Sequence, residues 1–254
     1  MYPYLSLGPF LIQLPLLVLL VGVWLGSHLT EKEATRLGLP AARVSNLIII
    51  GLAAGIIGAR LAYAARYLDA YLNNPLSLVA LNANTLAGMD GLLVGLLAAL
   101  LYGRRVNLPL RPTLDALAPG LAAFLVALGV AHLLSGDAFG APADLPWSIY
   151  LWSEYRHPSQ VYETLAALVI YLIIIKKPFG QPGAGLNFTM LVALSAAARL
   201  FLEAFRGDSL VWLGGFRSTQ VISLVVLVTT LLVMRRWART PVSPLPSEPS
   251  PAEL

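Results

Sequence analysis

The sequence lacks cysteine and has few charged residues. Only 12% of its 254 residues are Asp, Glu, Lys or Arg, roughly half the share usual in a soluble globular domain, whereas 57% are hydrophobic. The missing cysteines exclude a disulfide framework, a thiolate metal site and a cysteine nucleophile, but not an action on the cysteine of another chain. The low charge, with a mean hydropathy of +0.74, excludes a water-soluble enzyme.

Long apolar runs are the main feature that the sequence does contain. They predict seven membrane-spanning helices, over residues 7–27, 44–67, 87–102, 116–135, 159–175, 185–205 and 218–234. The predicted fold class is therefore all-α, with one polytopic transmembrane domain over residues 1–240. Residues 241–254 are rich in Pro and Ser and are expected to form a disordered cytoplasmic tail.

The positive charges indicate how the spans are oriented. Eleven of the seventeen Lys and Arg residues lie beside alternate connections, which the positive-inside rule assigns to the cytoplasm. The N-terminus is then outside and the C-terminus inside. The net charge of +4 reflects this orientation, and no nucleic-acid partner is expected. The connection 136–158 carries Trp147, Tyr150, Trp152 and Tyr155 and is expected to lie at the membrane surface.

Ionisable residues within or beside the predicted spans are the candidates for function, because a charge in hydrocarbon is costly unless it is paired or hydrated. In the predicted orientation they gather in the outer half of the membrane. Since guanidinium groups bind phosphate, they predict a cavity for an anionic lipid headgroup. With their polar neighbours the candidates are Arg60, Asp90, His132, Asp137, Arg156, Gln160, Glu163, Arg199 and Glu203.

Other interpretations of these residues remain open. A purely structural one pairs Arg199 with Glu203, four residues apart on one helix face, to hold helices together. A transporter that uses Asp90, Arg199 and Glu203 as a relay is disfavoured, because no polar path continues through the inner halves of the spans. The sequence contains no HExxH motif, P-loop or nucleophile elbow, so neither a metal nor another cofactor is predicted.

Several segments resemble one protein family. The run RHPSQVYE, residues 156–163, is similar to the RHPSQ-x-YE element of bacterial prolipoprotein diacylglyceryl transferases. RLFLEAFR, residues 199–206, resembles their RF-x-x-EFFR segment, GARLAY at 58–63 resembles their GAR motif, and STQVISL resembles M-G-Q-I-L-S. The resemblance implies transfer of a diacylglyceryl group from phosphatidylglycerol to the lipobox cysteine of a preprolipoprotein, without a metal, at the outer face of the bacterial plasma membrane.

The resemblance also implies roles for particular residues. Arg199 matches an arginine that the family places at the phosphate, and Glu203 matches the neighbouring glutamate. Substrate binding is expected of four further residues, namely Arg60, Arg156, Gln160 and Glu163.

The chain departs from the family pattern elsewhere. Asp90 stands where the family has a histidine, and Gly129, His132, Ser135 and Asp137 stand where its signature has an arginine, two asparagines and a glutamate. Two hypotheses follow. In the first, His132, Asp90 and Asp137 belong to a rebuilt acid–base site of an active transferase. In the second, the protein is a non-catalytic lipid-binding or assembly subunit of a larger membrane complex.

Overall fold

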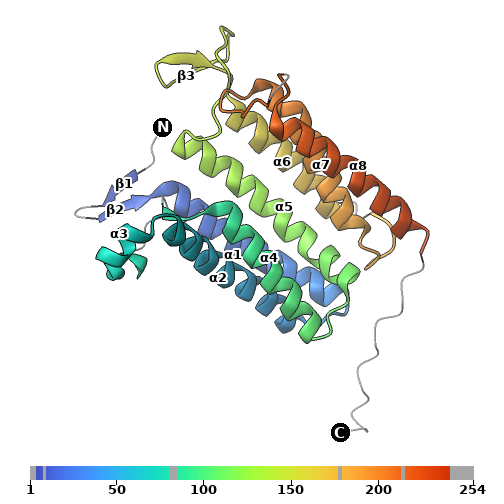
Figure 1. Cartoon of the computed structure of the whole chain (residues 1–254). Helices are drawn as coiled ribbons and strands as arrows, with labels where there is room; N and C mark the ends of the chain where they lie inside the picture. The colour runs from blue at the N-terminus through green and yellow to red at the C-terminus, as the bar shows by residue number, and fades with distance from the viewer. Residues whose placement is uncertain (1–3, 8–9, 80–84, 177–178, 213–214, 241–254) are drawn as a thin grey trace, which may run out of the picture. The chain divides into compact units, whose positions relative to one another are not determined.

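The computed structural model is mostly helical and describes residues 4–7, 10–79, 85–176, 179–212 and 215–240 (Figure 1). Helices occupy each of the seven predicted ranges. The chain divides into two compact units, one of residues 39–110 and one of residues 1–38 with 111–254. The expectation of one domain over 1–240 stays a prediction, and the expected tail at 241–254 lies outside the described residues.

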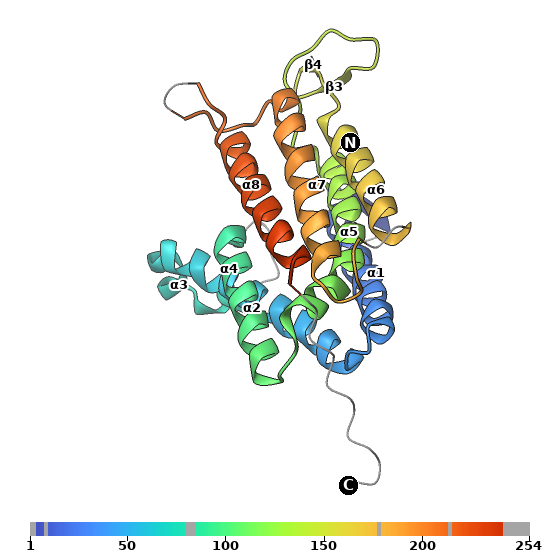
Figure 2. The same ribbon diagram turned by 90° about the vertical axis from the view of Figure 1, so that its right-hand side faces the viewer.

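The larger unit is a helical bundle with two small hairpins. Figure 2 shows α5, α6 and α7 running side by side, with α8 next to α7. The hairpins pair β1 (Tyr4–Leu7) with β2 (Phe10–Gln13), and β3 (Ile149–Leu151) with β4 (Glu154–Arg156), both antiparallel. The helices are α1 (Leu14–Arg36), α5 (Leu110–Ser135), α6 (Ser159–Lys176), α7 (Leu186–Leu202), the short 3-10 helix η3 (Glu203–Phe205) and α8 (Ser218–Ala238).

The smaller unit is a pair of long helices joined by a short helical connection. Its elements are α2 (Ala41–Arg66), α3 (Leu68–Asn73), η1 (Pro75–Val79) and α4 (Gly88–Arg105). The backbones of α2 and α4 approach closely at glycines. A Cβ atom added at Gly95 would lie 2.7 Å from the carbonyl oxygen of Gly51, so a side chain there would push the two helices apart.

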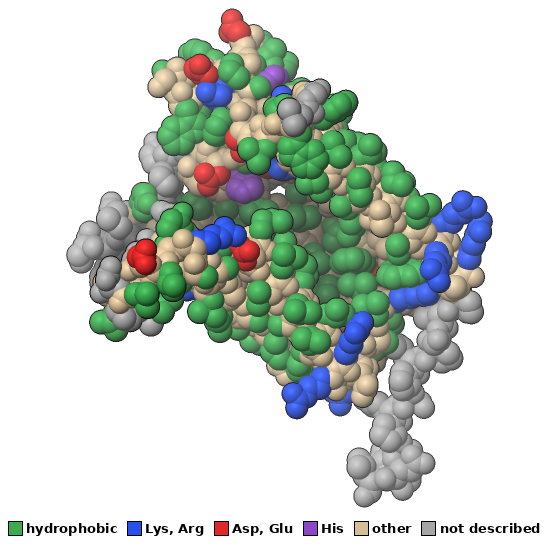
Figure 3. All heavy atoms as spheres, in the orientation of Figure 1, with side chains coloured by type: hydrophobic (Ala, Val, Ile, Leu, Met, Phe, Trp, Pro, Cys, Tyr) green, Lys and Arg blue, Asp and Glu red, His purple; other side chains and the backbone are tan. Residues whose placement is uncertain are grey.

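The surfaces of the helices are apolar. Figure 3 shows hydrophobic side chains covering the helix flanks on the face in view. Six of the described helices are long and apolar enough to cross a membrane: α1, α2, α5, α6, α8 and α7 with its η3 extension. The exception among the predicted spans is α4, which has 18 residues and carries Asp90, Arg104 and Arg105. The protein is therefore a polytopic membrane protein built from α-helices.

The first helix starts and ends later than the sequence predicts. A helix is expected over 7–27, but α1 begins at Leu14 and ends at Arg36. Pro15 fits the first helical turn, because the backbone N–H groups of that turn make no hydrogen bond within the helix and proline has no N–H group. The residues before α1 form the β1–β2 hairpin. At its other end α1 continues because Glu, Lys and Ala favour helix and Arg36 donates two hydrogen bonds to Glu33, at 2.8 and 2.5 Å.

A buried carboxylate determines where α7 begins. The side chain of Asp115 on α5 is 3% exposed and accepts hydrogen bonds from the N–H groups of Gly185, at 2.8 Å, and Phe188, at 3.0 Å. The first N–H groups of a helix have no partner within the helix, so the carboxylate supplies one. Gly185 has a φ of +80°, which glycine adopts without strain. At the same end, the Arg111 guanidinium lies 5.1 Å from the ring centre of Trp237 on α8.

Substitution of this carboxylate should destabilise the larger unit. Asp115→Ala removes the acceptor of two backbone N–H groups, and we expect the free energy of unfolding to fall by about 2–4 kcal/mol. Thermal or denaturant unfolding in detergent micelles measures this loss. Asp144→Ala is the matched control, because Asp144 is exposed. Equal effects of the two substitutions would contradict the anchoring role of Asp115.

Candidate functional site

Three segments are joined by backbone hydrogen bonds at one end of the larger unit. They are the connection that follows α5, the residues before α6 and the residues after α7. The N–H of Ala141 donates to the carbonyl of Phe205 at 2.8 Å, and the N–H of His157 donates to the carbonyl of Ala141 at 3.0 Å. The N–H of Gly207 donates to the carbonyl of Phe139 at 2.9 Å. These bonds fix the ends of α5, α6 and α7 relative to one another.

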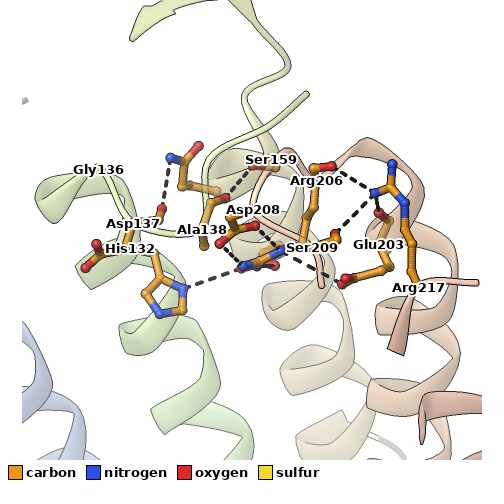
Figure 4. A network of polar contacts seen from close by, with 12 residues as sticks. His132, Gly136, Asp137, Ala138, Ser159, Glu203, Arg206, Asp208, Ser209 and Arg217 are labelled. Carbon is orange, nitrogen blue, oxygen red and sulfur yellow. Dashed lines mark hydrogen bonds and ion pairs between the residues drawn. The ribbon is translucent and has the colours of Figure 1, made fainter. Parts of the chain in front are cut away.

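The carboxylate of Glu163 on α6 is the centre of an ion-pair network at this end. Its side chain is 13% exposed, and its Oε1 accepts from Nη1 of Arg199 and from Nη1 of Arg206, both at 2.6 Å. Its Oε2 lies 3.5 Å from Nδ1 of His132. Figure 4 shows the part of the network around His132 and Arg206. One carboxylate thus joins residues of α5, α6 and α7.

Arg206 is fully engaged within the protein. Its Nε and Nη2 donate to the two carboxylate oxygens of Asp208, at 2.9 and 2.6 Å, while Nη1 donates to Glu163. Burial lowers the pKa of the Arg206 guanidinium, but the hydrogen bonds and charges of Asp208 and Glu163 outweigh it, so the net pKa is raised. Arg206 is therefore permanently charged, and its donors are occupied by protein carboxylates.

Glu203 supplies a second buried carboxylate to the network. Its side chain is 1% exposed, and its Oε2 lies 3.4 Å from Nε of Arg199 and 3.9 Å from Nε of Arg206. Arg217, directly before α8, donates through Nη1 to the backbone carbonyls of Glu203 and Arg206 and to Oγ of Ser209, the last two at 2.8 and 3.2 Å (Figure 4). Through Nη1, Arg217 therefore fixes the turn that carries the network.

Arg199 is the accessible arginine of the network. Its side chain is 35% exposed, and among the described residues its Nη2 has no hydrogen-bond or ion-pair partner. It lines two pockets. The first, of about 130 Å³, lies between α5, α6 and α7 and includes His132 and Glu163. The second, of about 360 Å³, lies between α5, α7 and α8, and both pockets are otherwise mainly apolar.

Two of the predicted substrate ligands instead hold the connection between α5 and α6. Arg156 donates to the carbonyls of Leu151, at 3.1 Å, and Gly140, at 3.2 Å, and to the carboxylate of Glu154, at 2.6 Å. Gln160 is 0% exposed and donates from Nε2 to the carbonyl of Asp137 at 3.0 Å. Both therefore act on the backbone beside the network, and their binding role stays a prediction.

Asp137 itself follows α5, and its residue is exposed. Its N–H donates to Oγ of Ser135 at 3.2 Å. The structure thus places Asp137 next to the network, with its backbone involved in local bonds.

Arg60 and Asp90 belong to the smaller unit, and the following contacts of both lie within that unit. Arg60 donates to the carbonyls of Ser77, Leu78 and Thr85 and organises the connection between α3 and α4. Asp90 forms an ion pair of 2.6 Å with Arg66. Of the nine predicted site residues, the structure joins four directly in the ion-pair network: His132, Glu163, Arg199 and Glu203.

Sequence reasoning missed Asp208. It lies in a connection, where a single acidic residue gives no functional signal, and its spacing of two from Arg206 becomes meaningful only when the chain turns after α7. Its bidentate pair with Arg206 is the reason that Arg206 is closed to a ligand.

The fold and the network define a helical membrane protein with arginines gathered around buried carboxylates beside apolar pockets. A family model described as prolipoprotein diacylglyceryl transferase matches residues 4–236, and the chain belongs to that family. This confirms the resemblance carried by the sequence motifs.

Named relatives match along most of their length. The chain is 28% identical over 207 residues to the phosphatidylglycerol–prolipoprotein diacylglyceryl transferase of Clostridioides difficile, covering 82% of this chain and 83% of that protein. The protein of the same name from Synechococcus elongatus is 28% identical over 243 residues, covering 89% and 84%. That from Bacillus cereus is 29% identical over 247 residues, covering 91% and 90%.

The buried arginine should be irreplaceable by lysine. Arg206→Lys cannot reproduce three directed contacts to two carboxylates, and we expect a loss of about 2–4 kcal/mol in the free energy of unfolding. Arg36→Lys is the control, because Arg36 also contacts a carboxylate twice but its side chain is 49% exposed. This substitution should lower the free energy of unfolding by less than about 1 kcal/mol. Chemical denaturation in micelles measures both, and an Arg206→Lys cost as small as the control would refute the assignment.

Proposed function

We propose that this protein transfers the diacylglyceryl group of phosphatidylglycerol, or another anionic phospholipid, to the thiol of a lipobox cysteine. The observation that carries the proposal is Arg199, a guanidinium held by Glu163 and Glu203 with one nitrogen left unpartnered among the described residues. A phosphate fits this donor, because guanidinium binds phosphate through directed, charge-assisted hydrogen bonds. The apolar pockets on either side of Arg199 suit the acyl chains of the same lipid.

The proposal includes the topology expected from the sequence. Seven helices, α4 among them, span the bacterial plasma membrane, with the N-terminus outside and the C-terminus in the cytoplasm. The arginine network then lies at the outer face, where the four aromatic residues of the connection 136–158 meet the lipid headgroups. Exposed fractions of 59% for Trp147, 67% for Tyr150, 61% for Trp152 and 60% for Tyr155 support this placement.

The chemistry is a displacement at the glycerol carbon that carries the phosphate ester. The thiolate sulfur of the acceptor forms a bond to that carbon, the carbon–oxygen bond breaks, and glycerol phosphate leaves with the electron pair. Arg199 stabilises the phosphate that departs, because its donors are fixed before the reaction begins. Glu203, 3.4 Å from Nε of Arg199, holds that guanidinium in place.

His132 is the proposed base. It lines the same pocket as Arg199 and is 29% exposed, so a thiol in that pocket can lose its proton to the imidazole. Gln160, Arg156 and Asp137 contribute by shaping the adjacent connection. The proposal assigns no step to Arg60 or Asp90, because each makes its contacts within the smaller unit.

The second hypothesis is a non-catalytic lipid-binding or assembly subunit. The observation that favours it is Gly129, which lines the pocket without a side chain where the family signature has an arginine. An added Cβ there would lie 2.5 Å from Oγ1 of Thr164, so α5 and α6 pack together at the position from which that arginine would extend. Under this hypothesis the protein binds phosphatidylglycerol and no thioether product forms.

Loss of the accessible arginine should slow transfer strongly without unfolding the protein. Purified protein in liposomes with phosphatidylglycerol and a lipobox peptide is assayed by mass spectrometry for a thioether-linked diacylglyceryl adduct. Arg199→Ala should reduce the rate of adduct formation by about 10²–10³-fold, the effect of removing one preorganised donor to a developing charge. Arg36→Ala, at the other end of the larger unit, should leave the rate unchanged.

Undiminished transfer by Arg199→Ala would refute the phosphate role. No adduct with the unaltered protein, while a relative is active in the same assay and phosphatidylglycerol still binds, would favour the non-catalytic subunit. Mild detergent extraction at native expression then tests the subunit hypothesis, because a stable larger complex is expected.

A further inference from the structure

The ring nitrogen of His132 that faces Glu163 is buried. Among the described residues Nδ1 has no hydrogen-bond partner, and Oε2 of Glu163 lies 3.5 Å from it. A carboxylate oxygen only accepts hydrogen bonds, and an imidazole nitrogen without a proton also only accepts. Two acceptors facing each other in a buried place repel, so the proton of the neutral imidazole belongs on Nδ1.

The orientation of the Glu163 carboxylate is set by its other oxygen. Oε1 accepts from two guanidinium groups at once, Nη1 of Arg199 and Nη1 of Arg206, both at 2.6 Å. Both contacts are made to the same oxygen and restrain rotation of the carboxylate. Oε2 is therefore held in the direction of α5, where His132 lies.

We propose that Glu163 is a positioning residue that holds His132 in its Nδ1–H tautomer and links this tautomer to the arginine expected to bind phosphate. The Nε2 lone pair is then free to accept a proton in the pocket that His132 and Arg199 share. Glu163 acts on the reaction through His132 and Arg199, and it does not serve as a ligand for the headgroup. The transfer of a thiol proton to Nε2 rests on the proposed transferase function, whereas the assignment of the tautomer does not.

The substitution Glu163→Gln gives this proposal a specific signature. The amide oxygen of the glutamine has to take the position of Oε1, because Arg199 and Arg206 only donate there. The amide NH₂ group then faces Nδ1 of His132, which has to accept. The proton of the neutral imidazole consequently moves to Nε2, and the lone pair needed for the thiol is lost.

The first measurement is the ¹⁵N spectrum of the histidine side chains of the full-length protein in micelles at alkaline pH. The chain has three histidines, and the signals absent from His132→Gln identify those of His132. We expect the Nδ1–H tautomer in the unaltered protein and the Nε2–H tautomer in Glu163→Gln. Glu33→Gln, which removes a carboxylate from the Arg36 ion pair on α1, should leave the His132 signals unchanged.

The second measurement separates kcat from KM in the liposome assay. Glu163→Gln should lower kcat by about 10²-fold or more, the usual contribution of a positioned base, while KM for phosphatidylglycerol changes less than about threefold. The KM is preserved because the amide oxygen still accepts from Arg199. A structural role alone would lower the amount of folded protein and leave the tautomer as it is.

The outcomes are distinguishable from failure of the proposed function. If the unaltered protein transfers no lipid, the tautomer experiment still decides the role of Glu163. An Nε2–H tautomer in the unaltered protein overturns the proposal even if Glu163→Gln does not fold. Where it folds, an unchanged tautomer, or a rise in KM with kcat preserved, overturns it as well. Glu163→Asp retains the charge and should keep the Nδ1–H tautomer with an intermediate kcat.

Discussion

The sharing of one carboxylate by two guanidinium groups is the interaction on which the site depends. Away from bulk water such contacts are strong, but each buried charge also loses its hydration, so every charge has to be matched. The bundle achieves this with acidic and basic side chains from α6, α7 and η3 and from the connection between η3 and α8. The carboxylates are Glu163, Glu203 and Asp208, and the guanidinium groups beside them are those of Arg199, Arg206 and Arg217.

The three arginines have different roles because their exposure and partners differ. Arg206, 10% exposed, is saturated by Asp208 and Glu163 and serves as a fixed structural charge. Arg217 donates to backbone carbonyls and holds the turn after α7. Arg199, which is more exposed, combines two anchoring contacts with a nitrogen, Nη2, that has no partner in the part of the chain that the structure describes. A guanidinium can do both because its donors point in several fixed directions, whereas an ammonium group cannot.

The sequence predicts the helices well because each depends on a long apolar run. Their ends are less predictable. The helix α1 extends to Arg36 through a polar segment, and the apolar residues of β2 directly precede its apolar run, so the sequence predicts one helix over both. The short β3–β4 hairpin has no apolar run of its own. In the site, intramembrane charge singles out Glu163, Arg199 and Glu203, which the structure joins in one network. Charge alone does not predict which partner a side chain contacts, and Arg156, grouped with them from the sequence, donates to the backbone of its own connection.

The anchoring of α7 by Asp115 bears on lipid selection under the proposed function. The helix has 17 residues and spans about 25 Å at 1.5 Å per residue, from its capped start to the turn held by Arg217. Because both ends of the helix are fixed, Arg199 keeps a constant distance from the end at Asp115. In the proposed orientation this distance sets the depth of Arg199 in the membrane, which a phospholipid headgroup reaches with its chains in hydrocarbon and a water-soluble phosphate ester does not. Under that proposal the discrimination is geometric, and it originates at the end of the helix opposite to the arginine.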